Sequence, residues 1–87
     1  MDMKTLEYLE ERAGKGRGIV KAIEKLKEMK ADLEQAKTAD IYCGRTTIRF
    51  SADSGSVRSS ILAKMMSLAK EEIDAEIARL EEELAAL

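Results

Sequence analysis

The sequence has no proline, no histidine and no tryptophan, and it has a single cysteine. Without proline, nothing forces a helix to break by removing a backbone N–H donor, so any interruption must come from glycine. One cysteine cannot form an internal disulfide, and without histidine the usual zinc ligand sets are missing. We therefore expect no disulfide, no metal and no cofactor, and a reducing, cytoplasmic environment.

Aromatic side chains and long hydrophobic runs are also scarce. Aromatic residues make up 3% of the 87 residues and charged residues 37%, a balance typical of long solvated helices with aliphatic seams. No apolar run is long enough to span a bilayer, and residues 1–12 lack the continuous apolar core of a signal peptide. We expect one domain, residues 1–87, without a membrane-spanning segment and too small to bury a generous core.

The last third of the chain carries the longest periodic pattern. Its apolar residues recur at gaps of three and four, which places them on one helical face. They are Leu62, Met66, Ala69, Ile73, Ile77, Leu80, Leu84 and Leu87. The pattern predicts a helix over residues 55–87, with Ser54 or Ser56 as the cap that accepts a free N–H of the first turn.

The first part of the chain predicts a second helix, over residues 4–37, whose apolar stripe changes phase near residues 14–18. Three glycines in these five residues cost a continuous helix about 2 to 3 kcal/mol relative to alanines. The sequence leaves open whether the segment is a kink, a loop or continuous helix. A phosphate-binding loop is disfavoured, because the glycine spacing does not fit one and no strand precedes it.

Residues 39–51 alternate between apolar and polar side chains, which predicts a β-hairpin. Gly44 and Arg45 suit a two-residue type II′ turn, in which the glycine supplies a positive φ. The turn pairs Cys43 with Thr46, Tyr42 with Thr47, Ile41 with Ile48, Asp40 with Arg49 and Ala39 with Phe50. Cys43 falls on the apolar face, where we expect a buried structural thiol. Because isolated hairpins are marginal, this one must lie on the helices or pair with another copy.

The fold class that follows is mainly α: an antiparallel, coiled-coil-like helical hairpin with a short β-hairpin between its two long helices. Folding about residues 46–47 brings apolar positions together, with Leu6 near Leu87, Leu9 near Leu84 and Ile19 near Ile73. The acidic stretch 71–83 would then face Arg12, Lys15, Arg17 and Lys21. Since two helices leave apolar flanks exposed, we expect a homodimer or higher homo-oligomer that forms a helical bundle.

Catalytic chemistry has little support. Without histidine there is no Ser-His or Cys-His pair, and no base is evident beside Cys43. Carboxylates such as Glu71, Glu72 and Glu76 are better explained as a solvated helix face than as a metal site. We therefore expect a protein that is not an enzyme.

The middle of the chain is the candidate binding region. Between Thr38 and Lys70 there are five basic residues against two acidic ones, in a chain of net charge −2. Arginines and hydroxyls here suit anions and acidic protein surfaces. The candidate residues for binding a partner or an anion are Tyr42, Arg45, Thr47, Arg49, Ser54, Ser56 and Arg58.

Two functions fit these residues. The first is a small regulator or inhibitor that presents the basic hairpin end to a partner protein. The second is an oligomeric protein that sequesters or senses a nucleotide or another phosphorylated small ligand, which would suit a phage or mobile-element accessory protein. Nucleic acid ranks below both, because the acidic helix end would repel phosphates.

Overall fold

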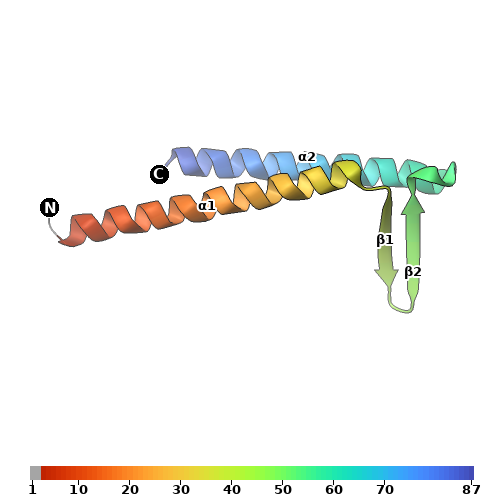
Figure 1. The fold of residues 1–87 in the computed structure, drawn as a ribbon, viewed down its shortest axis with the longest axis horizontal. Helices are drawn as coiled ribbons and strands as arrows, with labels where there is room; N and C mark the ends of the chain where they lie inside the picture. Colours follow the sequence, from red (N-terminus) through yellow and green to blue (C-terminus); the bar gives the residue numbers. More distant parts are fainter. Residues whose placement is uncertain (1–2) are drawn as a thin grey trace.

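A computed structural model describes residues 3–87, without the side chain of Ser54, as two long helices joined by a hairpin. Helix α1 spans Met3–Gln35 and helix α2 spans Val57–Ala85. Strands β1 (Thr38–Cys43) and β2 (Thr46–Ser51) lie between them, followed by the short 3-10 helix η1 (Ala52–Ser54). This arrangement confirms the predicted fold class, a mainly α chain with a β-hairpin between two helices (Figure 1).

Helix α1 runs without interruption through its three glycines. A β-carbon at Gly16 would lie 3.8 Å from Cδ1 of both Leu84 and Leu87, so the backbone of α1 comes close to the end of α2 there. Contact with a neighbouring helix supplies stability that intrinsic propensity does not, and it offsets part of the glycine cost. The alternatives of a kink and a loop are therefore resolved as continuous helix.

The hairpin has the register that its sequence predicts. Strands β1 and β2 are antiparallel, with Ile41 opposite Ile48 and Asp40 opposite Arg49, and Cys43 and Thr46 close the ladder. Gly44 has a φ of 60°, and Arg45 is not in the positive-φ region. This combination excludes a type I′ turn, which needs positive φ at both positions, and agrees with the predicted type II′ turn.

The two helices lie antiparallel, so both ends of the chain are at the same end of a long molecule (Figure 1). The principal extents are 66 × 27 × 16 Å, and the radius of gyration is 19.5 Å. A compact 87-residue domain would have a radius of gyration of about 12 Å. The chain is therefore a rod with much of its surface uncovered.

The seam between the helices differs in register from the prediction. Ile19 and Ile23 of α1 pack with Leu80 of α2, whereas Ile19 was expected near Ile73. Leu6 and Leu9 were expected against Leu87 and Leu84, but both are exposed. The helices are displaced by about two to three turns, because α2 begins after η1 at a point beyond the end of α1 (Figure 1).

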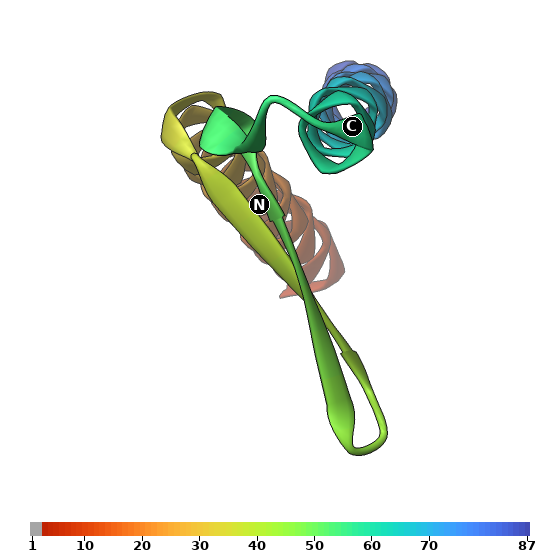
Figure 2. The same cartoon turned by 90° about the vertical axis from the view of Figure 1, so that its right-hand side faces the viewer.

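The hairpin projects from the pair of helices and does not lie along them (Figure 2). Only its base is covered: β2 packs on α2, Phe50 is buried and Ile48 is half-buried. Cys43, near the turn, is exposed. The prediction of a buried Cys43 is therefore wrong, because the apolar face of the hairpin continues past the point where the helices can cover it.

Candidate functional site

The outer half of the hairpin is the most exposed feature of the fold. All side chains from Ile41 to Thr47 are exposed, and Tyr42 is 78% accessible to solvent. Strand pairing and the two-residue turn hold these residues in a fixed register. The result is a defined projecting surface, which we call the hairpin tip (residues 41–47), that is available to another molecule (Figure 2).

Below the tip, Asp40 and Arg49 form a two-pronged ion pair across the strands. Nε of Arg49 donates to Oδ1 of Asp40 at 2.8 Å, and Nη2 donates to Oδ2 at 3.0 Å. These hydrogen bonds hold the pKa of Asp40 below its ordinary value and raise that of Arg49. The charge of Arg49 is therefore largely neutralised by Asp40 within the hairpin itself.

Arg45 differs from Arg49 in having no ion pair within residues 3–87. It sits in the turn itself, between Gly44 and Thr46. Tyr42 and Thr47 lie opposite each other on the polar face, the face that also carries the Asp40–Arg49 pair. The structure thus brings Tyr42, Thr47 and Arg49 together on one face and places Arg45 at its end.

The serine-rich segment before α2 is used mainly in local hydrogen bonding. Ser56 is the cap of α2, and its Oγ accepts the backbone N–H of Arg58 at 3.3 Å, as predicted. Oγ of Ser59 donates to the Ser56 carbonyl, and the Arg58 guanidinium donates to the Arg49 carbonyl at 3.5 Å. Ser54 lies in η1, and its side chain is outside the described structure. Arg58 thereby ties the start of α2 to the base of the hairpin.

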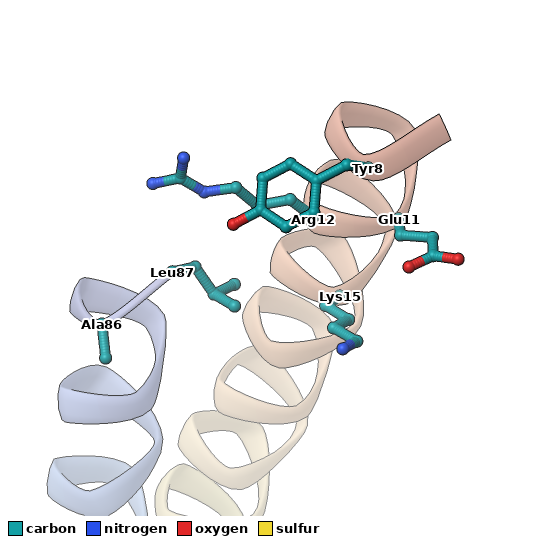
Figure 3. A pocket seen from close by; sticks show the side chains of 6 residues that line it. All are labelled: Tyr8, Glu11, Arg12, Lys15, Ala86 and Leu87. Carbon is teal, nitrogen blue, oxygen red and sulfur yellow. The ribbon is translucent and has the colours of Figure 1, made fainter. Parts of the chain in front are cut away.

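A shallow pocket at the opposite end of the molecule was not predicted. Tyr8, Arg12 and Lys15 of α1 line it together with Glu11 and the end of the chain at Leu87. Figure 3 shows the Tyr8 ring and the Arg12 side chain reaching over the end of the shorter helix. Sequence reasoning missed this pocket because the expected seam register paired Leu87 with Leu6.

Charges along the seam pair differently from the prediction. Lys30 reaches Asp74 at 2.8 Å, and this contact raises the pKa of Lys30. Arg79 binds Glu76 and Glu83 of its own helix, which lowers the pKa of Glu76. Among the described residues, no ion pair joins the acidic stretch 71–83 to the predicted partners Arg12, Lys15, Arg17 and Lys21.

The described residues contain no group of three or more side chains suited to hold a metal ion. Neither helix in residues 3–87 combines the length and apolar content of a bilayer-crossing segment. Comparison with known protein families, curated proteins and solved structures found no match.

Proposed function

We propose that this chain is a non-enzymatic interaction protein, a small regulator or inhibitor, that binds a partner protein through its hairpin tip. The observation that supports this function is the projection of residues 41–47 away from the helices, with every side chain exposed. A two-stranded hairpin that projects from the rest of a fold buries little apolar surface and so contributes little to the stability of the fold. Its exposed end, which the strand pairing holds in one register, is instead suited to entering a concave surface on another protein.

The chemistry of the tip indicates the kind of surface it fits. Tyrosine and arginine are enriched among the residues that dominate binding energy in protein interfaces, and the tip presents Tyr42 and Arg45. Arg45 forms no ion pair within residues 3–87, so a carboxylate on the partner would not have to displace one. The partner surface that fits best is a cleft with an apolar wall for Tyr42 and an acidic residue for Arg45.

The test is capture of a partner by the purified, immobilised protein, followed by measurement of its affinity with the purified partner. Tyr42→Ala and Arg45→Glu should each weaken binding about five- to thirtyfold, since the loss of a contributing interface side chain costs about 1 to 2 kcal/mol. Arg49 is left unchanged, because replacing it would also remove the hydrogen bonds to Asp40.

The matched control is Lys27→Glu, which makes the same change of charge as Arg45→Glu at an exposed position of α1 away from the hairpin. Circular dichroism establishes that each variant keeps its helical content. Equal affinity of the wild type, the two tip variants and the control would show that the partner binds elsewhere, and the proposed function of the hairpin would be wrong.

A further inference from the structure

An apolar stripe on helix α1 is left uncovered by the rest of the chain. Leu6, Leu9 and Val20 are 44%, 42% and 40% exposed, and Ala13 is exposed as well. Leu6, Ala13 and Val20 are seven residues apart, and Leu9 and Gly16 each follow three residues after a member of that series. Apolar or small residues that alternate at gaps of three and four are typical of a helix that packs along a second helix. We call these five residues the α1 stripe.

A shallow groove lies beside the second half of the α1 stripe. Its lining, which is mostly apolar, comes from α1 and from one residue of α2: Gly16, Arg17, Val20, Lys21, Glu24 and Leu84. Gly16 has no side chain to fill the groove, and the backbone there comes close to Leu84, since a β-carbon would lie 3.8 Å from its Cδ1. We call this depression the α1 groove. It is open to an apolar side chain from outside the chain.

The first turns of α1 have no second helix beside them. Helix α1 extends past the end of α2 at the open end of the rod (Figure 1). Gly16 is the α1 position that approaches Leu84 and Leu87, so Leu9 and Leu6 lie about two to three turns beyond that contact. Helical turns without tertiary contacts are marginal in water. One part of the stripe thus lacks a neighbour, and the other part lies beside a groove without an occupant.

The charges of α1 indicate which neighbour fits. Residues 3–11 carry three glutamates and one lysine, whereas residues 12–21 carry four basic residues and no acidic one. An antiparallel pair of α1 helices puts the acidic segment of each copy beside the basic segment of the other. A parallel pair puts like charges together. Charge therefore favours a second copy of this helix in the antiparallel orientation.

The small residues of the stripe suit one register of that pair. Placing Leu9 opposite Val20 of a second copy also places Ala13 opposite its Gly16, because both pairs are centred on the same point of α1. Small residues at the centre let the two backbones come close. Leu9 then enters the α1 groove of the second copy, beside Leu84. A twofold axis repeats each contact, so both grooves are filled.

The same register brings one pair of opposite charges together. Glu10 and Arg17 are seven residues apart, on the same side of the α1 stripe. In the antiparallel pair, Glu10 of each copy lies close to Arg17 of the other. Neither residue forms an ion pair within residues 3–87, so both are available.

The uncovered surface is large enough for this interface. The chain exposes 6905 Å², whereas a folded monomer of 9.7 kDa exposes about 5,100 Å². The excess, about 1,800 Å², is more than the roughly 800 Å² that each partner buries in an interface of standard size.

We propose that this chain forms an antiparallel homodimer through α1, in which the first turns of α1 in each copy pack along the α1 groove of the other. The two hairpin tips then lie at opposite ends of the dimer, so one dimer can engage two partner molecules. This arrangement concerns α1 alone and does not depend on the function proposed for the tip.

Mass and cross-linking test the dimer and its orientation. Sedimentation equilibrium of the wild type should give the mass of two chains, and a monomeric mass would overturn the proposal. In a Cys43→Ser background, Leu9→Cys and Val20→Cys proteins are mixed and treated with a short bis-maleimide. The mixture should give a covalent dimer. Each variant alone should not, because its two cysteines lie about 16 Å apart along the helix axis. Cross-linking of the Leu9→Cys protein with itself would mean a parallel pair and would refute the proposal.

Charge reversal tests the register. Glu10→Lys and Arg17→Glu should each raise the dimer Kd several-fold, and the double variant should restore it, because the exchanged charges again attract. The control is Glu82→Lys, which makes the same change of charge on α2, about half a turn round that helix from buried Leu80, and should leave the Kd unchanged. Absence of rescue in the double variant would show that this register is wrong.

Loss of an apolar contact tests the groove. Leu9→Glu should raise the dimer Kd about tenfold or more, because a charged side chain cannot replace leucine against Val20 and Leu84. Met29→Glu, at an exposed apolar position of α1 outside the stripe, is the matched control and should leave the Kd unchanged. Circular dichroism establishes that both variants stay helical. Equal effects of the two substitutions would place the α1 groove outside the interface.

Discussion

At the scale of single residues, the two arginines of the hairpin have different surroundings because they occupy different positions in it. Arg49 faces Asp40 across the ladder and donates two hydrogen bonds to its carboxylate. Arg45, in the turn, has no acidic residue opposite it. The first arginine holds the strands together below the tip, and the second is the one to which the proposed function assigns a contact with a partner.

The Asp40–Arg49 pair should make hairpin stability depend on pH. The hydrogen bonds from Arg49 lower the folded-state pKa of Asp40, so its stabilising effect is present at neutral pH and is lost as the pH falls through that lowered pKa. Asp40→Asn should therefore be less stable than the wild type at pH 7, and the difference should narrow as the solution becomes more acidic. Urea unfolding of both proteins between pH 7 and pH 2 measures this difference.

Glu76→Gln provides a comparison, because the pKa of Glu76 is lowered in the same way by Arg79 within α2. Its stability difference from the wild type should narrow over the same acidic range, while amide exchange in the hairpin stays unaffected. A gap between the wild type and Asp40→Asn that is constant with pH would mean that ionisation of Asp40 contributes nothing to stability.

The strand pairing was predictable from the sequence because a side-chain period of two and a glycine turn leave one register. The exposure of Cys43 was not. Alternation assigns Cys43 to the apolar face, but it carries no information on how far the helices extend over that face. The same limit applies to Arg58, whose hydrogen bond to the Arg49 carbonyl arises only from how α2 meets the hairpin.

At the scale of elements, helix α1 contains glycines that its own contacts do not require. A β-carbon at Gly18 would meet no atom within 4 Å, and one at Gly14 would meet only the flexible end of Arg17, at 3.8 Å. The situation differs at Gly44 and Gly55, where φ is 60° and 59°. These two positions favour glycine for backbone reasons, whereas Gly14 and Gly18 lie in ordinary helix.

Replacing the helical glycines should therefore stabilise the protein. Gly14→Ala and Gly18→Ala should each raise the free energy of unfolding by about 0.5 to 1 kcal/mol, because alanine restricts the unfolded chain and fits the helix without strain. Gly55→Ala should lower it by a similar amount, about 1 kcal/mol, since alanine is strained at positive φ. Chemical denaturation monitored by circular dichroism gives all three values. Destabilisation by Gly18→Ala would indicate that another surface approaches the helix at that glycine.

At the same scale, the sequence did not define which residues of α1 and α2 lie opposite each other in the seam. Apolar residues repeat every three or four positions on both helices, so displacements of whole turns still place apolar residues together. The short η1 and the loop before α2 decide among these alternatives, because they place the first residue of α2 beyond the end of α1. Neither segment carries a sequence pattern that predicts this offset.

At the scale of the whole molecule, the core is small for a chain of this length. Among residues 3–87, six apolar residues are buried, and three of them form the seam cluster between the helices. The six are Ile19, Ile23, Phe50, Leu62, Ile73 and Leu80. A core this small leaves much of the apolar surface of the two helices exposed.

Two leucines of α2, six positions apart, differ in how much of the side chain is buried. Leu62 is 3% exposed and Leu68 is 60% exposed. Leu62→Ala should lower the free energy of unfolding by about 2 to 5 kcal/mol at every protein concentration, because it leaves a cavity in the core. Leu68→Ala should cost less than about 0.5 kcal/mol, because most of this side chain is already in contact with solvent. Chemical denaturation of both variants measures the two effects, and a loss of stability at Leu68 as large as that at Leu62 would mean that the Leu68 side chain is buried in solution.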